Sequence, residues 1–128
     1  MMALLRERDP LVQDVVEGCI DAYTACKETI AYSLEAGEPF SDGRFIVTLL
    51  CCSDTCRTTG EFVIVEAELI EDSCRFCALV CERCAVRCDQ MPDDEQMQLC
   101  AETLRRNVAA CEAILGTGFW DRDGRPAR

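Results

Sequence analysis

The sequence predicts an all-α protein, an antiparallel four-helix bundle with a cysteine-lined core. Three observations lead to this prediction. Apolar residues recur at helical spacing in four successive segments of the chain. Short connections, rich in capping and turn residues, separate these segments. The chain also carries 12 cysteines, and most of them fall on the apolar faces of the segments.

The first predicted helix covers about residues 9–36. Asp9 is a suitable N-cap and Pro10 suits the first helical position. Apolar residues then recur at helical spacing from Leu11 onward. Gly37 favours the end of this helix, because glycine readily adopts the backbone conformation found just after a helix.

The second predicted helix covers about residues 42–66, and the segment Ser41-Asp42-Gly43 can cap it. Its weakest part is Phe62-Val63-Ile64-Val65, a β-branched run that by itself is typical of a strand. Gly60 weakens a helix by about 1 kcal/mol relative to alanine. We still predict a helix here, because a single strand would have no partner.

The third predicted helix covers about residues 69–90 and contains the most informative stretch. Five cysteines follow one another at alternating steps of three and four residues. At about 100° per residue they share one helix face within about 80°, whereas a strand would place them on both sides. Neighbours on this face have Cβ atoms about 5–6 Å apart, too far for an easy disulfide but suitable for sharing a soft metal ion. The five are Cys74, Cys77, Cys81, Cys84 and Cys88.

The fourth predicted helix covers about residues 93–115. Met91-Pro92-Asp93-Asp94 forms the preceding turn, and its acidic residues suit a helix start. Gly116 stops the helix. Residues 1–116 are therefore predicted to form the bundle, and residues 117–128 a mobile C-terminal tail.

The third helix repeats cysteine at positions i, i+4, i+7 and i+11, and each other helix carries two cysteines in the same frame. The remaining frame positions are nearly all apolar, so this face should point to the core. Core filling would explain any single cysteine, but so many oxidisable thiols on converging faces favour metal binding. Cys51 lies about 100° away from its stripe and should occupy a helix contact or the surface. The predicted metal ligands are Cys19, Cys26, Cys52, Cys56, Cys74, Cys77, Cys81, Cys84, Cys88, Cys100 and Cys111.

Thiolates are soft ligands that suit Cu(I), zinc and iron–sulfur clusters. Zinc and iron–sulfur sites tend to draw cysteines from loops, whereas these cysteines lie on continuous predicted helices. Cu(I) accepts two or three thiolates, so several ions could lie along the bundle axis. Pairs four residues apart on one helix could each hold one ion, namely Cys77 with Cys81, Cys84 with Cys88, and Cys52 with Cys56.

Composition argues against several other classes of protein. The net charge of −11 argues against binding nucleic acid or an anionic membrane surface. No run of 18 apolar residues is present, and the N-terminus lacks an export signal, so the expected compartment is the reducing cytoplasm. The chain has no histidine and no glycine-rich phosphate loop, which argues against an enzyme.

Three segments of the sequence resemble the cysteine-rich four-helix-bundle copper storage proteins of bacteria. They are Leu50 to Phe62, the run Cys74-x-x-Cys77-Ala-x-x-Cys81-x-x-Cys84-Ala-x-x-Cys88, and Cys100 to Cys111. The resemblance covers about residues 10–115. It implies a protein that stores or buffers several Cu(I) ions through core thiolates and forms a homo-oligomer, commonly a homotetramer.

The sequence departs from this family pattern at identifiable positions. Tyr23, Ile30, Leu104 and Asn107 occupy frame positions where a cysteine would complete the stripe, and histidines that line the bundle mouth in cytosolic members are absent. These departures imply that fewer copper ions bind. They also motivate an alternative function, a metal-poor structural or interaction bundle. A second alternative is a thiol redox sensor in which disulfides form between helices.

Three further residues carry open alternatives. Met91 and Met97 flank the last turn, where their thioethers could admit Cu(I) to the bundle or simply pack the end of the core. Asn107 either forms hydrogen bonds across the bundle or faces water, depending on the rotation of its helix.

Overall fold

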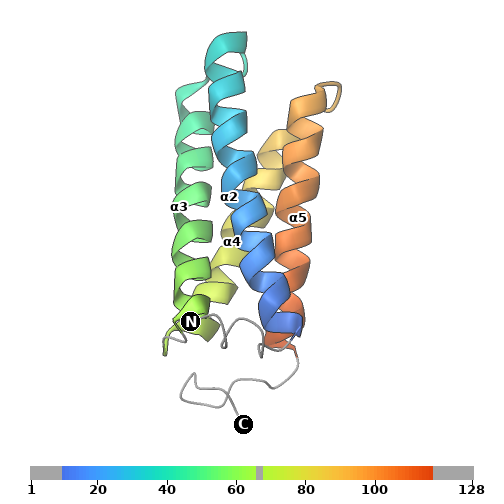
Figure 1. The fold of residues 1–128 in the computed structure, drawn as a ribbon. Helices are drawn as coiled ribbons and strands as arrows, with labels where there is room; N and C mark the ends of the chain where they lie inside the picture. The colour runs from blue at the N-terminus through green and yellow to red at the C-terminus, as the bar shows by residue number, and fades with distance from the viewer. Residues whose placement is uncertain (1–9, 66–67, 117–128) are drawn as a thin grey trace.

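The computed structural model describes residues 10–65 and 68–116, which form four antiparallel helices. Helix α2 packs against α3 and α5, and α4 packs against the same two helices, so the four surround one shared interior (Figure 1). The predicted all-α four-helix bundle is confirmed. The helices are α2 (Pro10–Ala36), α3 (Gly43–Ile64), α4 (Ile70–Asp89) and α5 (Glu95–Leu115).

Side-chain caps and glycine define the helix ends. The Asp42 carboxylate accepts a hydrogen bond from the Phe45 backbone N–H at 3.2 Å and caps α3. Asp94 caps α5 in the same way, through the Met97 N–H at 3.0 Å. Gly37 follows α2 with a φ of 77°, a left-handed conformation that glycine adopts without strain. Asp9, the predicted cap of α2, lies outside the described residues, as does the predicted tail 117–128.

The β-branched run is helical, as predicted. Residues Phe62 to Ile64 form the last turn of α3, and Val65 is its C-cap. Gly60 also lies within α3, where a Cβ atom added to it would lie 3.3 Å from the Cys19 Cβ. The missing side chain therefore lets α3 approach α2 closely.

The interior has apolar residues at each end and thiols between them. At the lower end in Figure 1, where α3 ends and α4 begins, the buried side chains are Val12, Val63, Ile70 and Ile114. At the upper end, where α3 and α5 begin, they are Phe45 and Met97. All the buried cysteines except Cys88 lie between these two layers along their helices. The lower end of the thiol-rich core is thus closed by apolar residues, whereas the upper end also holds the buried polar residues Thr29 and Ser33 of α2.

Candidate metal centre

Eleven of the 12 cysteines are buried, and all 12 are free thiols. The buried set is the same as the set of ligands predicted from the sequence. Cys51 is exposed, which agrees with its predicted position off the stripe. Burial confirms that the stripes face the core, whereas a ligand role for each cysteine stays a prediction.

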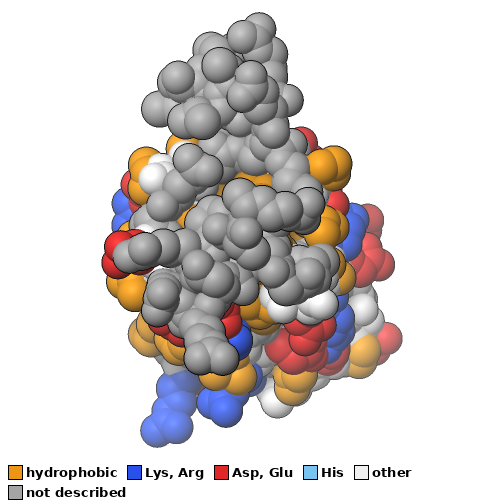
Figure 2. Space-filling view, turned by 90° about the horizontal axis from the view of Figure 1, so that it is seen from below, with side chains coloured by type: hydrophobic (Ala, Val, Ile, Leu, Met, Phe, Trp, Pro, Cys, Tyr) orange, Lys and Arg blue, Asp and Glu red, His pale blue; other side chains and the backbone are white. Residues whose placement is uncertain are grey.

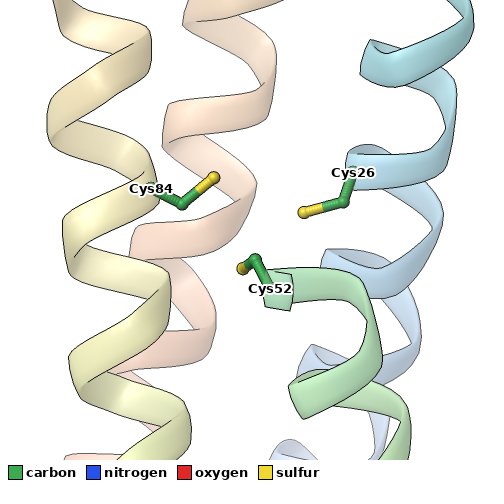
Figure 3. Close-up of side chains that lie close together, drawn as sticks. All are labelled: Cys26, Cys52 and Cys84. Carbon is green, nitrogen blue, oxygen red and sulfur yellow. The ribbon is translucent and has the colours of Figure 1, made fainter. Parts of the chain in front are cut away.

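Three helices contribute one sulfur each to an upper cluster. Cys26 on α2, Cys52 on α3 and Cys84 on α4 have Sγ atoms that all lie within 4.8 Å of one another. Figure 3 shows these side chains pointing from their separate helices toward a common space. Residues 58 positions apart in the chain therefore meet at one candidate site, which we call the upper triad.

A second cluster adjoins the first and shares one residue with it. Cys52, Cys56 and Cys81 also have Sγ atoms within 4.8 Å of one another. The Cys56–Cys81 separation is 3.5 Å and the Cys52–Cys81 separation is 3.9 Å. We call this group the middle triad. Because Cys52 belongs to both triads, the two candidate sites are continuous.

Cys77 extends the array toward the lower end. Its Sγ lies 3.9 Å from that of Cys56 and 4.0 Å from that of Cys81. With metal–sulfur bonds of about 2.3 Å, three sulfurs around one ion lie about 4.0 Å apart, and two in a line about 4.6 Å apart. The observed separations therefore suit a soft ion held by two or three thiolates.

The sequence predicted pairs of cysteine ligands within single helices, but the shortest sulfur–sulfur distance among the described residues joins two helices. Cys77 and Cys81, four residues apart on α4, have sulfurs 4.0 Å apart, which fits the predicted pair. Cys56 on α3 and Cys81 on α4 are closer, at 3.5 Å. The upper triad takes its cysteines from three helices and the middle triad from two, so the geometry of both candidate sites depends on how the helices pack.

Hydrogen bonds between thiols change their pKa values in opposite directions, and the hydrogen bond with Cys26 raises the pKa of Cys52 above its ordinary value. Hydrogen bonds from Cys26 and Cys88 lower the pKa of Cys100 to about 4. Hydrogen bonds from Cys111 and Cys19 hold the pKa of Cys77 below its ordinary value. These contacts link Cys88 and Cys100 to the upper triad through Cys26, and Cys19 and Cys111 to Cys77; Cys74 contacts Cys111. The thiols thus form one network in which protons are shared and can be exchanged for metal ions.

Asn107 lies inside this network. It is fully buried, and its Nδ2 donates toward the Sγ atoms of Cys77 at 3.5 Å, Cys19 and Cys81 at 3.7 Å, and Cys56 at 3.9 Å. The prediction that Asn107 bonds across the bundle is confirmed, and the alternative that it faces water is wrong. Sequence reasoning gave it no role in the metal site, although its place in the cysteine frame was a usable signal.

The carboxamide oxygen of Asn107 faces the other way, toward α2. Among the described residues Asn107 Oδ1 has no hydrogen-bond partner, and a Cβ at Gly18 would collide with it. Gly18 therefore provides the space for this amide. A buried unpaired carbonyl costs roughly 1–3 kcal/mol, so the amide is held here at some cost to stability.

The two methionines occupy different environments. Met97 is fully buried, whereas Met91 is partly buried and packs against the core. Nothing in these positions tests whether either one admits copper, which stays a prediction. The other residues that replace cysteine in the repeated frame make apolar contacts. Leu104 is buried, and Tyr23 and Ile30 pack at the edge of the core.

Comparison with known proteins identifies relatives of this bundle. The family model described as "Copper storage protein" matches residues 9–116. A comparison of the sequence with curated proteins finds no match. None of the described helices has the length and apolar composition needed to cross a membrane.

Solved structures share the fold at low sequence identity. The Cu(I)-bound copper storage protein BsCsp3 is 23% identical with a TM-score of 0.77, over 83% of this chain and 99% of that one. The Nmul_A1745 protein of Nitrosospira multiformis is also 23% identical with a TM-score of 0.77, over 84% and 97%. The apo form of copper storage protein 3 from Bacillus subtilis is 23% identical with a TM-score of 0.71, over 81% and 98%. These similarities agree with the observed four-helix bundle.

Proposed function

Since this chain belongs to the copper storage protein family, we propose that it stores or buffers several Cu(I) ions inside its helical bundle. One observation carries the proposal: adjoining buried groups of thiols, linked through Cys52, Cys56 and Cys81, follow the bundle axis. A similar fold holds Cu(I) in the BsCsp3 structure. Storage of this kind needs no catalytic step, so we propose no enzymatic role.

Burial supports Cu(I) storage on physical grounds. A thiolate in a low-dielectric interior is costly unless a positive charge lies nearby. A Cu⁺ ion supplies that charge when the thiol protons leave, so metal binding and deprotonation should occur together. Soft thiolate ligands favour this ion over harder metals. The eleven buried cysteines are the proposed ligands.

Titration of the reduced protein with Cu(I) under anaerobic conditions tests the proposal. In competition with a Cu(I) chelator such as bicinchoninate, the protein should retain several equivalents. Retention of no more than one ion would overturn storage. That outcome would favour the structural-bundle or redox-sensor alternatives, which stay predictions.

We also propose that the protein is a homo-oligomer and works in the cytoplasm, where thiols stay reduced. Contiguous exposed apolar surface is typical of interaction sites. In the coloured part of Figure 2, which views the bundle from below, separate hydrophobic side chains lie among charged ones. The exposed large apolar side chains of α3 and α4 include Val47, Leu50, Phe76, Leu79 and Val86.

Sedimentation of the reduced protein should show a species larger than the monomer. Replacing Phe76 and Leu79 together with serine should shift the protein toward the monomer, because both side chains are exposed and apolar. A monomer at all concentrations in the unmodified protein would contradict the proposed assembly.

A further inference from the structure

We propose that Thr29, held by Gln96, is a positioning residue that supports Cys100 as a Cu(I) ligand at the upper end of the bundle. The inference rests on the proposed storage function and adds to it a group outside the thiol array that sets how tightly part of the copper is held. Its support comes from the burial of Thr29, from the contacts of its hydroxyl, and from the charge that bound thiolates leave in the core.

The upper end of the core contains polar side chains. Thr29 and Ser33 are fully buried on α2, and they continue the helix face that carries Cys26. Thr29 lies three residues after Cys26, so the two side chains are neighbours on the helix surface. Burial of a hydroxyl is costly unless it forms hydrogen bonds. The partners of the Thr29 hydroxyl therefore indicate what this residue does.

The Thr29 hydroxyl connects α2 with α5. Gln96 Nε2 donates to Thr29 Oγ1 at 3.1 Å, and Thr29 Oγ1 donates to the Ala25 carbonyl oxygen at 2.7 Å. Gln96 and Cys100 are four residues apart on α5, so they lie on the same face of that helix. The contact with Gln96 thus places Thr29 against the face of α5 that carries the fully buried Cys100.

The pKa of Cys100 agrees with this contact. Hydrogen bonds with Cys26 and Cys88 lower this pKa most, and a hydrogen bond with the Thr29 hydroxyl lowers it further. A hydrogen bond lowers the pKa of a thiol when it favours the thiolate. Since the thiolate is the form that binds metal, the same hydrogen bond favours Cys100 as a ligand.

Copper binding leaves negative charge in the core that the ion does not neutralise. Two or three thiolates around one Cu⁺ ion carry more charge than the ion supplies. No Lys or Arg side chain is buried within residues 10–65 and 68–116. Hydrogen-bond donors must therefore offset the remaining charge. The Thr29 hydroxyl is such a donor beside Cys100.

This hydroxyl can turn from Ala25 to Cys100 without leaving a group unpaired. The Ala25 carbonyl also accepts the backbone N–H of Thr29 within α2. Gln96 continues to donate to Thr29 Oγ1, which polarises the O–H bond and strengthens it as a donor. The Cys100 proton leaves to solvent as the Cu–S bond forms, and copper remains Cu(I), so no oxidant or reductant is needed.

Removal of the hydroxyl alone tests the role of Thr29. Thr29→Val keeps the shape of the side chain, and it should lower the affinity for about one Cu(I) ion at least tenfold, as is typical when a partner of a metal ligand is lost. Titration against bicinchoninate should show the loss at high chelator concentration and the normal number of ions at low concentration. Thr29→Ser keeps the hydroxyl and should bind copper as the unmodified protein does.

Two other hydroxyl groups on α2 provide matched controls. Thr24 is exposed, and its hydroxyl donates to the Ile20 carbonyl at 2.9 Å, the same local bond that Thr29 makes to Ala25. Ser33 is fully buried like Thr29, but its hydroxyl has no hydrogen-bond partner among the described residues. Thr24→Val and Ser33→Ala should therefore leave the copper affinity unchanged.

Paired substitutions test whether the effect passes from Gln96 through Thr29 to Cys100. Gln96→Met keeps the length of the side chain but removes the amide. It should weaken binding severalfold by itself and add nothing in the Thr29→Val protein, because the two residues act in one chain. In a Cys100→Ser background, Thr29→Val should make no further difference, since the ligand that Thr29 supports is absent.

Unchanged affinity in Thr29→Val would overturn this role while leaving the storage function intact. A larger loss in Thr29→Ser than in Thr29→Val would also overturn it, because that order is expected if Thr29 only fills space. An equal loss in Ser33→Ala would show a general effect of buried hydroxyl groups and would contradict the proposal. Thermal melting of the apo variants measures their stability separately. If the unmodified protein retains no Cu(I), the storage function itself fails and this role falls with it.

Discussion

Cys52→Ser should reduce the number of tightly bound Cu(I) ions by about two, because Cys52 belongs to both the upper and the middle triad. A serine hydroxyl is a hard ligand that Cu(I) binds poorly. It would also interrupt the array at the point where its two parts join. Anaerobic titration against bicinchoninate measures the loss directly.

The neighbouring cysteine provides a matched control. Cys51 lies on the same turn of α3 but is exposed, whereas Cys52 is fully buried. Cys51→Ser makes the same chemical change outside the array, so copper capacity should stay unchanged. Equal losses in the two variants would contradict storage in the bundle interior. Thermal melting of both apo proteins shows whether the buried hydroxyl of Cys52→Ser has also destabilised the fold.

The helical periodicity of the sequence was sufficient to predict the architecture. The spacing from Cys74 to Cys88 identified α4, and all five of its cysteines are buried. The β-branched run in α3 was the main ambiguity. Local propensity there favours a strand, but the side chain of Val63 is buried against neighbouring helices. Tertiary packing therefore decides the conformation of this segment.

The contacts between helices could not be predicted in the same way. Periodicity gives the buried face of each helix but not its axial offset or its distance from a neighbour. Sequence reasoning therefore paired cysteines along single helices, whereas Cys56 lies closest to Cys81 on another helix. The close approach at Gly60 and the space that Gly18 provides also depend on these offsets. Such features become visible only when the helices are assembled.

Asn107→Cys should raise the copper capacity by about one ion. The amide nitrogen of Asn107 lies 3.5–3.9 Å from four cysteine sulfurs, so a thiol at this position would join an existing cluster. The change would also restore cysteine at a frame position and remove the unpaired buried oxygen. Titration with Cu(I) under the same competition measures the gain.

Two variants separate the possible roles of this amide. Ala109→Cys adds a thiol to the same helix at an exposed position, so it should not add a tightly bound ion. Asn107→Leu removes both the amide and the potential ligand, and its capacity should equal that of the unmodified protein if Asn107 only occupies a ligand position. A lower capacity in both Asn107 variants would instead mean that the N–H groups support bound thiolates, since hydrogen bonds to a charged group favour that charged form. That result would contradict the predicted gain and would make Asn107 part of the copper site itself.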